Sequence, residues 1–75
     1  MKRLSELRPG ESGIVSSVEG DKAIRRRMLD MGLVKGAEVQ VKRVAPLGDP
    51  IEFIVRGYSL SLRKSEAHAI HVETA

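Results

Sequence analysis

With 75 residues, the chain is expected to form one small domain over residues 1–75. Because it has no cysteine, its core must be stable without disulfide bonds, and thiolate metal sites are excluded. Its 41% hydrophobic and 31% charged residues are typical of a globular protein and exclude a disordered one. The net charge of +3 is concentrated in residues 21–43, where seven basic side chains accompany three acidic ones, so we expect one positive surface.

The N-terminal segment shows no export signal. Two positive charges open the chain, but no apolar stretch of secretory length follows, and nowhere is there a run approaching the roughly 20 apolar residues that cross a bilayer. We therefore expect a cytoplasmic protein that does not span the membrane, and that a partner could recruit to the membrane's inner face.

The first elements are a helical turn and a bent strand. Leu4 and Leu7, spaced three apart ahead of the Pro9-Gly10 turn, fit a single helical turn laid on the core. Residues 11–18 predict a short strand. Its apolar positions do not alternate cleanly, which predicts a bulge.

One α-helix is predicted over about residues 21–31. Asp21 is suited to cap its N-terminus, and Gly32 supplies the left-handed residue that ends it. Ile24, Met28 and Met31 fall at positions i, i+4 and i+7, which predicts an apolar stripe facing the core.

Short strands joined by tight turns follow the helix. Alternating apolar residues predict strands over residues 37–45, 51–56 and 58–63 and from Ile70 onward, with a bulge at Lys42-Arg43 and one helical turn at residues 65–67. Strands this short bury enough surface only by curling onto themselves. The sequence therefore predicts a mainly β fold, a small SH3-like barrel of about five strands with one inserted α-helix.

The chain lacks the groups that catalysis needs. It has no cysteine nucleophile, no Gly-x-Ser-x-Gly elbow and no phosphate-binding glycine motif, and a barrel of this size offers little concavity for a substrate. We expect a binding protein without a cofactor rather than an enzyme.

Metal binding has only weak candidates. His68 and His71 are three apart, so on a strand they point to opposite faces and cannot hold one ion. The alternatives are two solvated imidazoles, a weak surface site that joins His68 to Glu66, or a metal bridge between two chains.

Arg25, Arg26 and Arg27 could bind an acidic protein surface or a nucleic acid, or could form an ordinary solvated face. The nucleic-acid alternative is weakened because the chain has only one tyrosine and one phenylalanine on which bases could stack. A nucleic-acid partner is therefore the second hypothesis, and protein contact is the first.

Three apolar residues are candidates for partner contact. Leu29 lies off the centre of the helical stripe, so it either covers the barrel edge beside Leu33 or forms an exposed patch with Arg25 and Arg26. Met28 is a second candidate, although its stripe position also fits the core. Leu47, between two prolines at a hairpin tip, could enter a partner's pocket or fold back onto its own barrel.

Several stretches of the sequence resemble the FeoA family. They are RMLDMGL at residues 27–33, VAPLGDP at 44–50, RGYSLSLRK at 56–64 and Glu66-Ala67, with Leu4, Leu7 and Gly10 matching the family's opening pattern. The resemblance covers nearly the whole chain in the same order.

This resemblance implies an SH3-like barrel that serves bacterial ferrous-iron uptake by docking on or regulating FeoB, the membrane iron transporter, as a monomer or weak homo-oligomer. Related domains also occur in iron-dependent repressors. That third alternative requires a DNA-binding region ahead of Met1, so we rank it below the other two.

Overall fold

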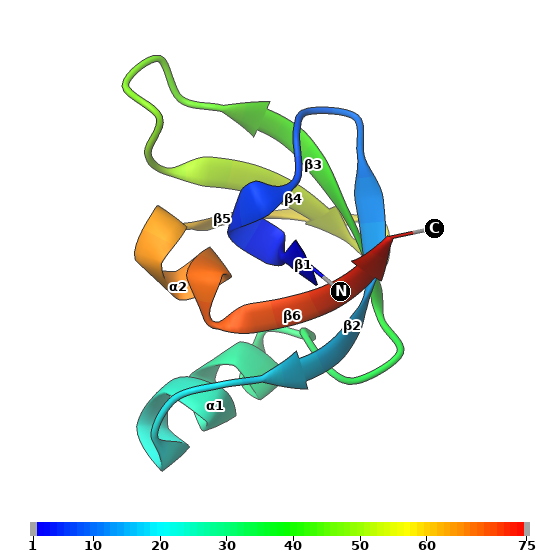
Figure 1. Ribbon diagram of the computed structural model, residues 1–75, viewed down its shortest axis with the longest axis vertical. Coiled ribbons are helices and arrows are strands. Elements are labelled where there is room, and N and C mark those ends of the chain that lie inside the picture. The colour runs from blue at the N-terminus through cyan, green and yellow to red at the C-terminus, as the bar shows by residue number, and fades with distance from the viewer. Residues whose placement is uncertain (1, 75) are drawn as a thin grey trace.

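The computed structural model describes residues 2–74 (Figure 1). Its elements in chain order are β1 (Lys2–Arg3), the 3-10 turn η1 (Leu4–Glu6), β2 (Ser12–Val18), α1 (Lys22–Asp30), β3 (Glu38–Val44), β4 (Ile51–Val55), β5 (Tyr58–Leu62), α2 (Lys64–His68) and β6 (Ile70–Thr74). The predicted mainly β fold and its inserted helix are confirmed. Six strands replace the expected five or so, because a two-residue segment at the N-terminus pairs with β6.

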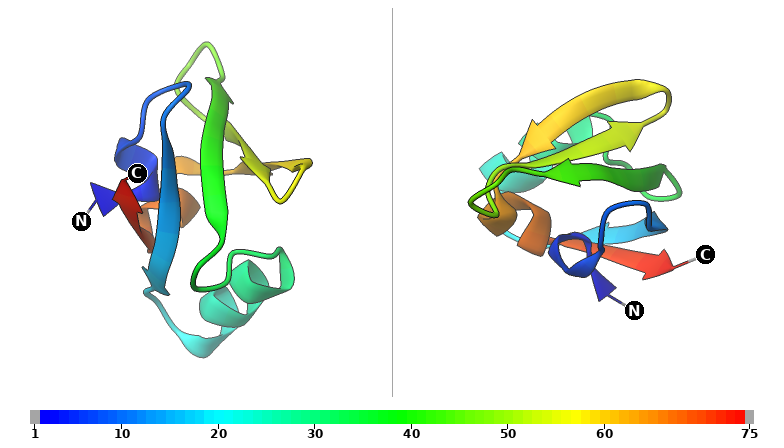
Figure 2. Two further views of the ribbon diagram at one scale, coloured as in Figure 1. Left: turned by 90° about the vertical axis from the view of Figure 1, so that its right-hand side faces the viewer. Right: turned by 90° about the horizontal axis from the view of Figure 1, so that it is seen from above.

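The strands form one antiparallel sheet in the order β1-β6-β2-β3-β4-β5. Figure 2 shows the sheet curling, so that β3, β4 and β5 face β2, β6 and β1 across the core. Both predicted bulges are present, as register shifts between Val15 and Ser17 and between Val41 and Arg43. The bulges bend the two strands where the sheet turns around the core.

A single hydrophobic cluster fills the inside of the curled sheet, with Phe53 fully buried. The alternation predicted for β4 places Ile51, Phe53 and Val55 inward, and β6 buries Ile70 and Val72 in the same way. No charged or polar residue among residues 2–74 is buried with them. The described part of the chain holds no helix of the length and apolarity needed to cross a bilayer.

The structure corrects two predicted apolar faces. Within the helical stripe only Met28 is fully buried, whereas Ile24 is 40% exposed, because α1 lies at one end of the barrel (Figure 1). In β5 only Leu62 is buried and Tyr58 is exposed, because β5 is the last strand of the sheet and no strand of residues 2–74 pairs with its outer side.

Candidate docking face on helix α1

Helix α1 begins and ends as the sequence predicts. The Oδ1 atom of Asp21 accepts a hydrogen bond from the backbone N–H of Ile24 at 3.0 Å, which satisfies one of the free donors of the first turn. Gly32 has φ +91°, a conformation that few other residues adopt at low cost, and it turns the chain away from the helix axis.

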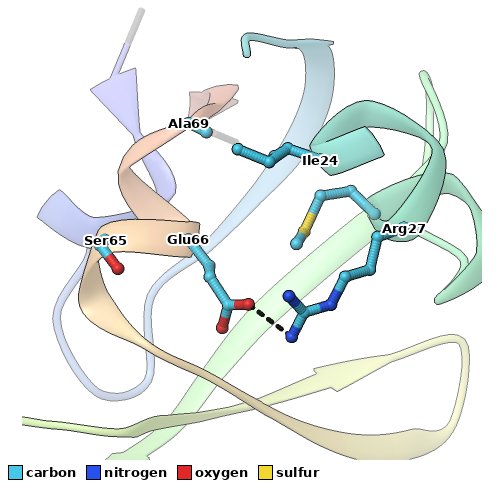
Figure 3. Close-up of a pocket in the computed structure, with 6 residues that line it drawn as sticks. Ile24, Arg27, Ser65, Glu66 and Ala69 are labelled. Carbon is cyan, nitrogen blue, oxygen red and sulfur yellow. Dashed lines mark ion pairs between the residues drawn. The ribbon is translucent and has the colours of Figure 1, made fainter. Parts of the chain in front are cut away.

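Three contacts attach α1 to the rest of the molecule. The Met28 side chain is fully buried in the core. Arg27 Nη2 lies 2.7 Å from Glu66 Oε2, an ion pair that joins α1 to α2 (Figure 3). The Tyr58 hydroxyl on β5 donates a hydrogen bond to the Met31 carbonyl at the end of the helix. These contacts fix one side of the helix, and an adjoining side is free except where Leu29 meets the barrel edge.

That free side carries three cations and one leucine. Lys22, Arg25, Arg26 and Leu29 line a shallow hollow of about 470 Å³. Their spacing of i, i+3, i+4 and i+7 places them on one helix face, so the same periodicity that identified the apolar stripe could have added Lys22 to the predicted residues. Within residues 2–74 no acidic side chain forms an ion pair with Lys22, Arg25 or Arg26.

Leu29 separates this hollow from a second one. The second hollow has a volume of about 120 Å³ and is lined by Val15, Ser17, Val18, Arg25, Leu29 and Lys35. Leu29 remains 49% exposed, so it covers the barrel edge with one side and faces solvent with the other. Leu29 is therefore neither fully covered nor fully exposed, and its role in partner contact stays a prediction.

A third hollow lies between α1 and α2 (Figure 3). It has a volume of about 210 Å³ and is lined by Ile24, Arg27, Met28, Ser65, Glu66 and Ala69. Ile24 and Ala69 contribute apolar wall, and the Arg27–Glu66 ion pair crosses one side of it. We call the exposed residues Lys22, Arg25, Arg26 and Leu29 the α1 face. The third hollow shares none of these residues and lies on the side of the helix toward α2.

Two predicted contact residues do not belong to the α1 face. Met28 has no exposed surface, so its position as a surface contact is corrected to a core position. Leu47 is 96% exposed, which excludes the alternative that it folds back onto the barrel. It lies at the tip of the β3–β4 hairpin, at the end of the molecule opposite α1 (Figure 1).

The structure keeps the predicted metal-binding residues apart. His68 ends α2 rather than lying on a strand, and its Nδ1 atom is 3.5 Å from the Ser5 hydroxyl. His71 on β6 has its Nε2 atom 2.8 Å from Glu19 Oε2, and Glu66 pairs with Arg27. Among residues 2–74 no three His, Cys, Asp or Glu side chains lie together in a way that could hold a metal ion.

The perturbed carboxylates lie on other elements than α1. Hydrogen bonds from Arg3 and His71 lower the pKa of Glu19, just after β2, from 4.5 to about 2. Arg43, bonded to Glu52 at 2.6 Å, also lowers the pKa of that carboxyl. Both pairs join strands or strand ends in exposed positions, which is typical of structural ion pairs.

The family model described as FeoA domain matches residues 2–74. Among curated proteins, the chain is 42% identical over 71 residues to the Fe(2+) transport protein A/Fe(2+) transporter FeoB fusion protein of Porphyromonas gingivalis. The match covers 95% of this chain and only 8% of that relative.

Solved structures give the same result. The solution structure of FeoA from Chlorobium tepidum has 49% identity and a TM-score of 0.89, covering 96% of this chain and 69% of that one. FeoA of Stenotrophomonas maltophilia, described as a prokaryotic SH3 domain protein complexed with zinc, has 36% identity and a TM-score of 0.84, covering 97% and 91%. The SH3-like class predicted from the sequence is confirmed.

Proposed function

This chain belongs to the FeoA family, and we propose that it serves ferrous-iron uptake by docking on the transporter FeoB through the α1 face. The proposed role is binding rather than catalysis. It places the protein in the cytoplasm, at the inner face of the membrane when it is bound to its partner.

The fusion protein of Porphyromonas gingivalis supports the choice of partner. There, a segment similar to this chain is part of the same polypeptide as a FeoB transporter. Linking two modules raises their effective concentration into the millimolar range for short linkers, so even a weak contact between them becomes populated. The contact itself would come from the surface of the FeoA-like domain.

The α1 face supports the choice of surface, because it combines the two features that protein interfaces use. Lys22, Arg25 and Arg26 supply positive charge that is not neutralised by ion pairs within the described residues. Leu29, half exposed between two hollows, supplies an apolar contact that is available for burial. Cations of this kind accelerate encounter with an acidic surface, and the buried apolar group slows dissociation.

Nucleic acid is the competing partner, because Lys22, Arg25 and Arg26 could also bind phosphates. Base stacking would have to come from Phe53 or Tyr58, but Phe53 is fully buried and the Tyr58 hydroxyl is bonded to α1. Without stacking, binding would rest on phosphate contacts alone and would fall steeply with salt. A duplex DNA and a single-stranded RNA therefore belong in the test as competitors.

The test is binding of the purified chain to detergent-solubilised full-length FeoB from the same organism, measured by biolayer interferometry. We expect Leu29→Asp to weaken binding by about tenfold or more, because a charge replaces an apolar contact at the centre of the interface. We expect Arg25→Glu with Arg26→Glu to do the same, mainly by slowing association.

Two variants make the result specific. Arg8→Glu reverses an exposed charge away from α1 and should leave the affinity unchanged. Leu47→Asp changes an exposed leucine at the opposite end of the molecule. Loss of binding in Leu47→Asp with full binding in folded Leu29→Asp would move the docking site to the hairpin. Tighter binding of the DNA or the RNA than of FeoB would overturn the proposed partner.

A further inference from the structure

Strand β5 ends the sheet with an unpaired outer edge. It pairs with β4 on one side and is the last strand in the sheet order (Figure 2). Within residues 2–74 no strand pairs with the other side of β5. The sheet's second end is β1, which is only two residues long and carries the charges of Lys2 and Arg3.

The hairpin register identifies which backbone groups point outward. Val55 lies opposite Tyr58 across a two-residue turn, so these two form a hydrogen-bonded pair, and such pairs recur at every second residue of an antiparallel ladder. Phe53 and Leu60 are the next such pair. Ser59 and Ser61 fall between them, so their N–H and C=O groups point away from β4, toward the free edge.

This edge lacks the features that usually prevent pairing. Proteins protect edge strands with charged residues, prolines, bulges or very short length. Strand β5 is five residues of Tyr-Ser-Leu-Ser-Leu with none of these, and its register against β4 is regular. Strand β1 has both short length and charge. The contrast indicates that the outer edge of β5 is available for binding.

Basic residues flank the free edge. Arg56 precedes β5, and Arg63 and Lys64 follow it, all three exposed. None of their side chains forms an ion pair within the described part of the chain. A strand that pairs with β5 would therefore meet Arg56 at one end and Arg63 and Lys64 at the other, where the Asp49 carboxylate also accepts a hydrogen bond from the Lys64 backbone N–H.

The same charges disfavour a second copy of this chain as the occupant. If two β5 strands paired antiparallel through Ser59 and Ser61, the turn residue Arg56 of one copy would come close to Lys64, the first residue of α2, of the other, at both ends of the pair. Like charges brought close together at the ends of a strand pair disfavour it. A strand with acidic residues at those positions would instead gain favourable pairs.

We propose that the outer edge of β5 binds an extended segment of a partner protein, apolar at alternate positions and acidic at both ends. The segment adds a seventh strand through the backbone groups of Ser59 and Ser61. Its apolar side chains lie beside Tyr58 and Leu60, which share one face of β5 and are partly exposed. This site is separate from the α1 face and does not depend on the function proposed above.

The test uses a nine-residue blocked peptide, Glu-Asp-Val-Thr-Val-Thr-Val-Asp-Glu, titrated into the ¹⁵N-labelled chain and followed by NMR. We expect the largest amide shifts at Ser59 and Ser61, saturating at millimolar peptide or below. A control peptide with lysine in place of each acidic residue should bind about tenfold more weakly. Equal binding of the two peptides, shifts confined to α1, or no shift would overturn the proposal.

Two sets of variants test the edge itself. Ser61→Pro removes one outward N–H and should reduce affinity by about tenfold, whereas Ser61→Thr keeps that N–H and should bind as the parent does. If Ser61→Pro does not fold, Arg56→Glu with Lys64→Glu leaves the backbone intact and should transfer the preference to the lysine peptide. A double variant that still prefers the acidic peptide would also overturn the proposal. Shifts of the β5 amides with protein concentration alone would indicate that β5 pairs with a second copy, and would overturn it too.

Discussion

At the residue scale, Met28 shows how a helix can be attached through one side chain. It is the only fully buried residue of α1, and its neighbours Arg27 and Leu29 remain on the surface. A methionine suits this role because its unbranched side chain fits an irregular space at the barrel end. From the sequence, its stripe position fitted the core as well as partner contact, and the structure decides for the core.

We expect Met28→Gln to destabilise the fold rather than to act on partner binding directly. The amide would be buried without a partner, which costs about 2–4 kcal/mol, a large part of the stability of so small a protein. Met28→Leu keeps the apolar volume and should cost under about 1.5 kcal/mol. Chemical denaturation measures both. Equal stability of the glutamine variant and the parent would show that the side chain is solvated.

Glu19 gives a pH-dependent contribution to stability. Its pKa is about 2 in the folded chain against 4.5 for the free side chain, chiefly because of the hydrogen bond from Arg3 and then that from His71. A carboxyl with a lowered folded-state pKa stabilises the fold above its unfolded pKa. That contribution is lost as the pH falls from about 4.5 toward 2.

We therefore expect Glu19→Gln to lower the melting temperature at pH 7, and the difference from the parent to vanish as the pH approaches 2. Thermal melts followed by circular dichroism between pH 7 and pH 2 measure this. Glu38→Gln is the matched control, because Glu38 is exposed and forms no ion pair within residues 2–74. A difference in melting temperature between Glu19→Gln and the parent that persists at pH 2 would mean that Glu19 acts other than through its charge.

At the scale of elements, the β4–β5 hairpin contains one residue in an unfavourable conformation. Arg56 has φ +50° and Gly57 has φ +86°, as two-residue turns of type I′ require. Asparagine tolerates this region better than arginine does. We expect Arg56→Asn to stabilise the fold by about 0.5 kcal/mol, and to raise the melting temperature by about 2–4 °C.

The matched variant for this turn is Gly57→Ala. It places a Cβ atom at positive φ and should lower stability by about 1 kcal/mol. Calorimetry of both variants measures the effect. A decrease in melting temperature for Arg56→Asn would indicate that the arginine side chain makes a stabilising contact that outweighs the backbone cost.

Local signals predicted most elements because the relevant physics acts over a few residues. The cap at Asp21, the end at Gly32 and the bulge at Lys42-Arg43 each follow from short-range rules, and all are present. The exposure of Ile24 could not be predicted in this way. It depends on where α1 lies against the barrel, which is decided by residues far away in the sequence, such as Tyr58.

At the scale of the whole molecule, the sequence identified residues of the candidate site but not how they are arranged in space. The positive segment identified Arg25 and Arg26, and helical spacing linked them to Leu29. Only the fold shows that the β3–β4 hairpin, which carries Leu47, lies at the end opposite α1 and that Arg27 forms an ion pair with Glu66. These relations join different elements that lie apart in the sequence, and no periodicity within one element reports them.

The charged residues and the leucine of the α1 face are expected to act at different steps of FeoB binding, which leads to a kinetic prediction. Charges act over a Debye length of about 8 Å at physiological ionic strength, so they change how often the partners meet, whereas apolar contact acts only after docking. Arg25→Gln with Arg26→Gln should therefore slow association and flatten its decrease with salt, leaving dissociation nearly unchanged. Leu29→Ala should accelerate dissociation and leave association within about threefold of the parent.

Surface plasmon resonance with full-length FeoB between 50 and 500 mM salt separates these two rates. The arginine variant must change mainly the association rate, since it removes long-range attraction. The leucine variant must change mainly the dissociation rate, since it removes contact area. If both variants act only on dissociation, the arginines make short-range contacts in the complex, and the positive charge of residues 21–43 does not steer the encounter. If neither variant changes either rate, the α1 face is not the surface that FeoB binds.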